Sequence, residues 1–423
     1  MEYKEFFDLA KQKGITNIQV TEYTSTGSSF KILEGKLEDF EDYNSKDYSI
    51  KAEYNNKTVK AIGNYLNEEI LDLLIMKSTS TDSNYEDDYL ENREIIKKEK
   101  TLEVDVSNEV VKLKELDNLR SKKVDKLESC FQEEDDGVRI INSNGVDISN
   151  NSHLCIFSSA SIVKNNDEVT CYDRTVLTTS KDEIDFENIT KDVINKSIIQ
   201  SDKEKIVGKK YDVILDNVVA ARIISHLVDM LAGSAIRNKM SCLENKLNKQ
   251  VFSNKITIVE EPTNKKYPGY RLFDDEGEET KDKTIIDKGR VNTYLYNIKE
   301  AKMAKTKPTG NGYGNINVRN MYLKPGSVSN EDLIKELKDG LYITDYMGSQ
   351  NTAINNTNGD ISLQVFGFIV KDGKIVKGFV PAIMTTTIFE LLSNIEEIGN
   401  DLIFTNIRVA SPSLLIKDIS IAS

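Results

Sequence analysis

VILDNVVAARIISHLVDMLAGSAI, residues 213–236, is the stretch on which the fold depends. Its first residues predict a short buried strand, and the residues that follow predict a helix over 217–233. Because apolar side chains occur all round this helix, we expect it to be deeply buried. A chain of 423 residues is long enough to build a large core around it, and two domains are the expectation for that length.

Helical and strand-like patterns alternate on the N-terminal side of this stretch. Residues 2–13 and 66–77 have helical spacing, and the segments between them alternate apolar and polar residues as half-buried strands do. Asn55-Asn56 is a plausible hairpin turn within those strands. Residues 79–96 are polar and acidic, so they predict a solvated loop or linker.

In the middle of the N-terminal half, the spacing of the apolar residues changes once from a helical to a strand-like pattern. Over 106–131 the apolar residues recur at intervals of three and four, which predicts one long amphipathic helix. From Val138 the pattern becomes strand-like, with a turn at Asn144-Gly145. A helix near 187–200 follows.

Short strands and glycine-rich loops dominate after the apolar helix, including a predicted strand over 270–277 and a helix near 386–397. Since strands and helices do not alternate regularly, the fold class is α+β. The lysine-rich and acidic SDKEK stretch interrupts the pattern near residue 205. We therefore expect an N-terminal α+β domain over 1–204 and a β-rich domain over 205–423 that carries the apolar helix.

The composition narrows the functional classes. The net charge of −13 disfavours nucleic acid as a partner, and no apolar run reaches the roughly 20 residues that span a bilayer. The first residues lack the pattern of a signal peptide, so a cytoplasmic location is expected. The four cysteines are far apart and form no CxxC pair, which suits free thiols; they are Cys130, Cys155, Cys171 and Cys242.

Histidine is scarce, and this restricts metal chemistry. Only His153 and His226 are present, so a site with three imidazoles from this chain is excluded. His153 and Cys155 lie on the same face of a predicted strand, but a strand histidine beside a buried thiol is more often structural than metal-binding. His226 lies within the apolar helix, where a hydrogen-bonded core histidine is the favoured interpretation. No HExxH or HExxxH motif occurs in the chain.

Two C-terminal motifs are further candidates for function. Asp274, Asp275, Glu276 and Gly277 follow Phe273, and in an extended segment Asp274 and Glu276 would share a face that could bind Mg²⁺ or supply an acid and a base. An acidic turn closed by the glycine is the alternative.

The second motif is a glycine-rich loop that contains Gly310 and Asn311. It lacks the lysine and the following helix of a phosphate-binding loop, so it predicts a tight turn.

Seven motifs in the C-terminal half occur in an order that resembles the TldD/PmbA family, once described as modulators of DNA gyrase. They are LFDDEGEETKDKTIIDKGRVNTYLYN (272–297), PTGNGYG (308–314), NMYLKPG (320–326), DGLYITDYMGS (339–349), GFIVKDGKIV (367–376), IEEIGNDL (395–402) and SPSLLIKDISI (411–421). The N-terminal half resembles the family more weakly, through GVRIINSNG (137–145). The resemblance implies a two-domain α+β fold.

The resemblance also implies two kinds of member. TldD-like chains carry HExxxH on the central helix and a cysteine-bearing loop after GNDL, which together hold zinc for peptide hydrolysis. PmbA-like (TldE-like) chains lack these ligands and pair with a TldD-like chain. Aligned on the strand VIL, this chain has Ser225, His226 and Met230 at the HExxxH positions, and no cysteine follows GNDL. The resemblance therefore implies a chain without a cofactor of its own, any zinc belonging to the partner.

The expected function is that of a PmbA/TldE-like, non-catalytic subunit of a dimeric metallopeptidase that acts on unfolded peptides. Asp274, Asp275, Glu276, Gly277, Gly310 and Asn311 would then line a peptide groove or hold the structure around it. Two alternatives stay open. The chain could be a homodimeric peptide-binding scaffold, or a hydrolase in its own right that uses Asp274 and Glu276 with a divalent ion.

Overall fold

The computed structural model describes residues 1–80, 104–165, 168–347 and 353–423. Nearly all of the loop predicted over 79–96 lies outside the described residues. None of the helices in the described ranges combines the length with the apolar composition that a bilayer-spanning segment needs.

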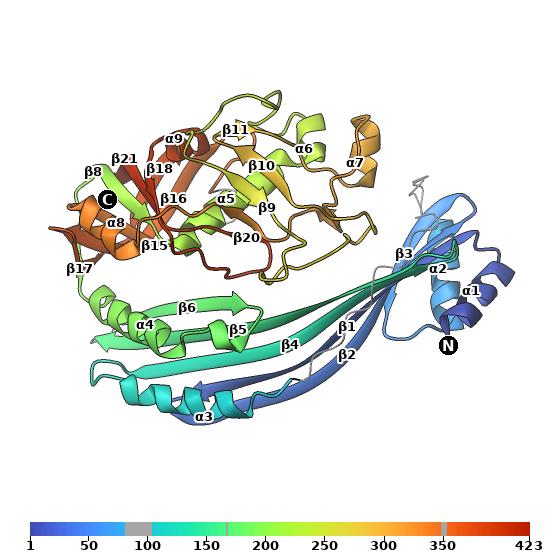
Figure 1. Cartoon of the computed structure of the whole chain (residues 1–423), viewed down its shortest axis with the longest axis horizontal. Helices are drawn as coiled ribbons and strands as arrows, with labels where there is room; N and C mark the ends of the chain where they lie inside the picture. The colour runs from blue at the N-terminus through green and yellow to red at the C-terminus, as the bar shows by residue number, and fades with distance from the viewer. Residues whose placement is uncertain (81–103, 166–167, 348–352) are drawn as a thin grey trace.

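A long antiparallel sheet forms the N-terminal half, in the order β3-β2-β1-β4-β5-β6. Figure 1 shows it running beneath the C-terminal half, with α1 and α2 at one end. The strands are β1 (Asn17–Leu33), β2 (Lys36–Tyr54), β3 (Lys57–Gly63), β4 (Lys126–Asn142), β5 (Asp147–Asn165) and β6 (Glu168–Thr178). The helices are α1 (Tyr3–Gln12), α2 (Glu68–Ser80), α3 (Ser107–Glu115), η1 (Leu116–Leu119), η2 (Lys181–Glu183) and α4 (Phe186–Gln200).

The helix predicted over 106–131 is wrong in its second half. Only α3 and η1 are helical, and β4 begins at Lys126. Along the first half of β4 buried side chains alternate with partly buried ones, and Leu127 and Phe131 lie on the buried face. The apolar residues there occur at spacings that fit both periods, and pairing with β1 and β5 decides in favour of the strand.

The C-terminal half contains a ring of strands and a second sheet. Strands β15, β8, β21, β18 and β16 pair in that order, and an additional pairing between β15 and β16 closes the ring. The second sheet has the order β11-β10-β9-β14-β20. Helix α5 lies between them and is mostly buried, which places the 213–236 stretch at the centre of the largest hydrophobic cluster.

The C-terminal half consists of the strands and helices from Lys203 onward. The strands are β7 (Lys203–Glu204), β8 (Lys209–Leu215), β9 (Ile258–Glu260), β10 (Lys283–Asp287), β11 (Arg290–Val291), β12 (Gly312–Tyr313), β13 (Asn315–Ile316), β14 (Met321–Leu323), β15 (Gly340–Met347), β16 (Asp360–Lys371), β17 (Lys374–Phe379), β18 (Ala382–Thr387), β19 (Ile395–Ile398), β20 (Val409–Ala410) and β21 (Leu414–Ala422). The helices are α5 (Asn217–Leu231), α6 (Gly233–Arg237), α7 (Ile298–Met303), α8 (Asn330–Leu337) and α9 (Ile388–Ser393).

The strand predicted over 270–277 is also wrong. This segment forms turns, with one isolated bridge between Phe273 and Glu279. Asp274 closes the turn by accepting backbone N–H groups, and Gly277 adopts a φ of +82° that a strand does not allow. With helices and mostly antiparallel sheets, the fold class is α+β as predicted. The boundary near residue 205 stays a prediction.

Hydrophobic clusters join the long sheet to the C-terminal half. Leu154 and Leu177 of the sheet lie in one cluster with Tyr322 and Phe404, and Val138 lies in another with Phe273. The backbone N–H of Leu177 also donates to the carbonyl of Phe404. One face of the second sheet and the neighbouring turn at Phe273 therefore pack on the face of the long sheet that β4, β5 and β6 form.

Candidate functional site

The N-terminus of α5 is fixed by a buried ionic network. Asp216 caps the helix by accepting from the N–H of Val218 at 2.8 Å, and its side chain is 1% exposed. Both of its oxygens also accept from the guanidinium of Arg174 on β6, at 3.1 and 2.9 Å. The hydroxyl of Tyr342 donates to the same carboxylate at 3.0 Å. Residues from both halves of the chain thus hold the start of the helix.

The side chains at the implied zinc-motif positions are engaged elsewhere or chemically unsuited. The Ser225 hydroxyl donates to the Arg222 carbonyl of its own helix at 2.6 Å. Met230 is fully buried, and its sulfur lies 3.7 Å from the sulfur of Cys242. Burial lowers the pKa of His226, which favours the neutral imidazole. One imidazole, a neutral hydroxyl and a thioether do not fit the ligand set of a catalytic zinc.

Two hollows lie along the polar face of α5 and meet at Asp229 and Ile316. The first measures about 490 Å³ and contains Ser225 and His226, opposite the 406–409 segment. The second measures about 650 Å³ and continues past the end of α5 towards Glu276 and α7. We call these two adjacent hollows the α5 groove.

Charged and aromatic groups line the first hollow. The Arg222 guanidinium lies 3.8 Å from the ring centroid of Tyr346 and pairs with Asp345 at 2.5 Å. Arg408 lines the opposite wall, and Asp229 is exposed between the two hollows. A lining with both signs of charge and an aromatic ring suits a peptide, whose backbone offers donors and acceptors alternately.

Asp274 and Glu276 act as supports rather than as an open pair. Asp274 is fully buried, and its two oxygens accept from the N–H groups of Glu276, Glu278 and Gly312 at 2.8–3.0 Å. Glu276 accepts from the N–H of Ile298 at the start of α7 at 2.7 Å. These contacts leave the geometry poorly suited to a shared divalent ion.

The remaining predicted residues hold the same corner of the structure. Asp275 pairs with Arg271 at 2.8 Å. Asn311 is fully buried and donates to both oxygens of Glu260, at 2.9 and 3.1 Å. Gly310 adopts a φ of +70°, which glycine accommodates more readily than other residues. The predicted residues thus shape the loop that forms one wall of the α5 groove.

The stability of the protein is expected to depend on pH through the buried carboxyl group of Asp274. Burial raises its pKa to about 8, against the opposing effect of the backbone donors. Because the folded pKa exceeds the unfolded one of about 3.9, its contribution to stability is fully present below about pH 4 and is lost as the pH rises through about 8. We expect the wild type to lose more stability than Asp274→Asn between about pH 5 and about pH 9 in urea unfolding. Parallel losses in the two proteins would contradict this assignment.

Sequence models assign two regions of the chain. Residues 99–200 match the PmbA/TldA metallopeptidase central domain, and residues 208–423 match the PmbA/TldA metallopeptidase C-terminal domain. The chain belongs to the PmbA/TldD family. The resemblance noted in the sequence is thereby confirmed.

The sequence of this chain is also similar to those of individual members of the PmbA/TldD family. Metalloprotease PmbA of Escherichia coli O157:H7 is 29% identical over 231 residues, which cover 55% of this chain and 50% of that protein. A metalloprotease TldD homolog of Buchnera aphidicola is 31% identical over 183 residues, covering 41% of this chain and 37% of that protein. The chain thus spans about half the length of the Escherichia coli relative.

Solved structures support the fold over the whole chain. A putative modulator of DNA gyrase from Thermotoga maritima has a TM-score of 0.86 at 23% identity and covers 100% of both chains. TldE from Thermococcus kodakarensis has a TM-score of 0.85 at 18% identity and covers 99% of both chains. At these identities the likeness extends to the fold alone.

Three polar residues that hold the start of α5 and the GNDL segment in place were given no role of their own from the sequence. Asp401, in the GNDL motif, accepts from the N–H and the hydroxyl of Ser413, and its carbonyl accepts from Asn217. Nothing in the sequence indicated that Arg174 and Asp216 form a buried ion pair. The only available signal for Asp216 was its position directly before an apolar helix, which is typical of an N-cap.

Proposed function

We propose that this chain is a non-catalytic, PmbA/TldE-like subunit that binds extended peptides for a TldD-like metallopeptidase partner. The observation that carries the proposal is the side-chain set Ser225, His226 and Met230 at the positions where the family resemblance places HExxxH. A neutral hydroxyl and a buried thioether do not replace two imidazoles as zinc ligands.

The α5 groove supports peptide binding as the retained role. Its two hollows share Asp229 and Ile316 in their walls, so an extended segment that occupied both would lie along α5. The short strand β13 forms part of the wall and offers backbone groups at the edge of a two-stranded hairpin. Pairing with a strand edge tolerates many peptide sequences, because backbone hydrogen bonds supply most of the affinity.

Co-expression with a TldD-like, HExxxH-bearing chain of the same organism tests the proposal. We expect a heterodimer that hydrolyses a disordered protein such as casein, whereas this chain alone is inactive. A stable homodimer that binds peptide and ignores the TldD-like chain would favour the scaffold alternative. Chelator-sensitive hydrolysis by this chain alone would overturn the proposal.

Filling the α5 groove tests the peptide role separately. In Ser225→Trp the indole occupies the first hollow, while the hydrogen bond that is lost serves only the helix's own backbone. We expect peptide affinity to fall by about tenfold or more, equivalent to about 1.4 kcal/mol. Fluorescence anisotropy with a labelled unfolded peptide measures it.

Ser420→Trp is the matched control, because Ser420 is exposed on β21 and lines neither hollow. Equal affinities for the two variants would remove the α5 groove from the proposal.

A further inference from the structure

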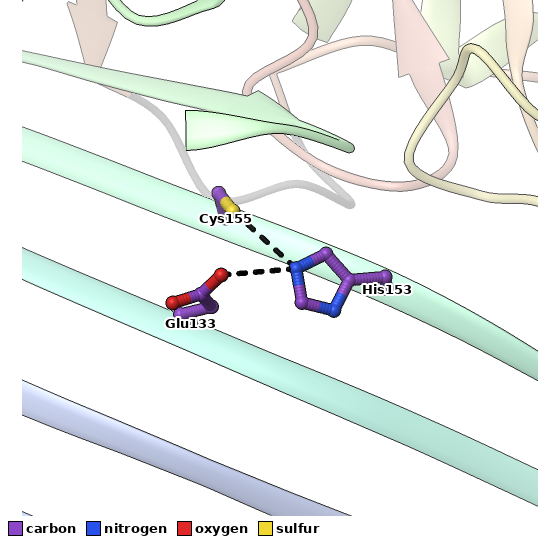
Figure 2. Close-up of side chains that lie close together, drawn as sticks. All are labelled: Glu133, His153 and Cys155. Atoms are coloured by element: carbon purple, nitrogen blue, oxygen red, sulfur yellow. Dashed lines mark hydrogen bonds and ion pairs between the residues drawn. The ribbon is translucent and has the colours of Figure 1, made fainter. Parts of the chain in front are cut away.

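A polar cluster lies buried on the face of the long sheet that α3 and η2 cover. Glu133 of β4 pairs in register with Cys155 of β5, and Asp135 pairs with His153, so these side chains share one face. Figure 2 shows the Glu133 carboxylate and the Cys155 sulfur both directed at one ring nitrogen of His153. The sequence suggested only the His153–Cys155 pair, and the fold adds the carboxylate.

The distances are close to those between ligands of one tetrahedral ion. The Nε2 atom of His153 lies 3.8 Å from Cys155 Sγ and 3.2 Å from Glu133 Oε1. All three ligand atoms lie within 4.8 Å of one another. Zinc bond lengths of about 2.3 Å to sulfur and about 2.0–2.2 Å to nitrogen or oxygen, at tetrahedral angles, separate the ligands by about 3.4–3.6 Å.

Buried carboxylates and two lysines surround the cluster. Glu109, Glu133 and Asp135 have side chains that are 2%, 6% and 3% exposed. Lys181 lies 3.5 Å from Glu109 and 3.1 Å from Glu133, and Lys112 lies 3.2 Å from Glu109. Each of these lysines is more exposed than the carboxylates with which it pairs.

Two buried atoms lack hydrogen-bond partners at this position. They are Oε2 of Glu109 and Nδ1 of His153. Lys112 and Lys181 lie 3.2 and 3.5 Å from the two oxygens of Glu109, so this carboxylate has ion-pair partners of its own and is not one of the three grouped ligands.

The surrounding groups are arranged as supports for metal ligands. Lys181 binds Oε2 of Glu133, which leaves Oε1 directed at the histidine. Asp135 Oδ1 lies 4.0 Å from Nδ1 of His153, on the other side of the ring. Metal-bound histidines commonly have a carboxylate in that position, which orients the ring and strengthens the ligand.

We propose that Glu133, His153 and Cys155 form a binding site for a divalent ion of the zinc class, with water as the fourth ligand. The ion would join β4 to β5, so its role is structural. This site is independent of the α5 groove and of the proposed function. Lys181 is partly exposed and lines a surface hollow of about 590 Å³, so its displacement gives the ion a way in.

The chemistry of binding is a proton exchange at sulfur. A thiol binds a metal ion as the thiolate, so the Cys155 thiol must give up its proton when the ion binds. The S–H bond breaks, a metal–sulfur bond forms, and the proton passes to the buffer. The apparent affinity should therefore increase with pH.

Titration of the chelator-treated full chain with Co²⁺ tests the site. We expect one equivalent to produce thiolate-to-cobalt charge-transfer absorption, and Zn²⁺ to displace the cobalt. Cys155→Ser should lose this absorption, and Cys171→Ser, at an exposed position on β6, should retain it. Circular dichroism without metal shows whether each variant is folded.

Two further variants keep the result interpretable. Asp135→Asn retains all three ligands and should weaken Co²⁺ binding by about 10–100-fold. Cys242→Ser removes the thiol beside Met230 and should leave the spectrum unchanged. The proposal fails if the wild type takes up no Co²⁺, or if the absorption persists in Cys155→Ser and disappears in Cys242→Ser.

Discussion

Replacing Arg174 by alanine is expected to lower the free energy of unfolding by about 3–5 kcal/mol, because the variant leaves the Asp216 carboxylate buried without its partner. Arg174 donates to both oxygens of Asp216, whose side chain is 1% exposed. Burial acts to raise the pKa of Asp216, but Arg174 and Lys196 outweigh it and hold the pKa below its usual value. The shift in the midpoint of urea unfolding, at unchanged slope, measures the loss.

The effect of Arg174→Ala should depend on pH with a definite sign. Since the folded pKa of Asp216 is depressed, its contribution to stability is present above the unfolded pKa of about 3.9 and is lost as the pH falls through the folded value. The difference between the variant and the wild type should therefore be largest near neutral pH and shrink in acid.

Arg120→Ala is the control for this variant. Its partners Glu34 and Asp117 lie near the surface, so its change should stay within about 1 kcal/mol. If Arg174→Ala behaves like Arg120→Ala, the hydrophobic clusters alone hold the long sheet against α5.

Local patterns in the sequence were enough to predict α5 and most strands. The apolar helix after residue 216 and the turns at Asn55-Asn56 and Asn144-Gly145 depend on neighbouring residues, and the structure contains all of them. The start of β4 could not be predicted in this way. Leu127 and Phe131 are four residues apart, as on a helix, but they also lie on one face of a strand.

That single error also hid the proposed metal site. β4 begins at Lys126, and the turn at Asn144-Gly145 joins it to β5. The register that this turn sets between the two strands places Glu133 opposite Cys155. An expected helix over 106–131 leaves no long strand leading to Glu133. The sequence therefore placed two of the three proposed ligands together, and strand pairing brings Glu133 beside them.

The α5 groove depends on contacts between distant parts of the chain. The sequence placed Ser225 and His226 on a helix, but the opposite walls come from residues 316–317 and 406–409. Nothing in the local pattern brings these segments to α5. Their position follows from the pairing of β20 with β14 and from the packing of β20 on α5.

Gly310→Ala is expected to have the second large effect, because the glycine-rich loop has no room for a side chain at that position. An added Cβ would lie 2.7 Å from the carbonyl oxygen of Glu279 and 2.9 Å from Cα of Thr280, and both are backbone atoms. The φ of +70° adds strain of about 1–2 kcal/mol. Overpacking typically adds about 1–3 kcal/mol, so the total loss should be about 2–5 kcal/mol.

Gly314→Ala separates the two causes within the same loop. Gly314 has a φ of +72°, but an added Cβ would have nothing within 4 Å, so this variant should lose only the strain of about 1–2 kcal/mol. Thermal unfolding of both variants beside the wild type measures the difference. Because Asn311 follows Gly310 and holds Glu260, we also expect Gly310→Ala to weaken peptide binding in the α5 groove. Equal stability of the two variants would mean that the loop moves away from residues 279–280 at little cost, and the groove wall would then not depend on close backbone packing.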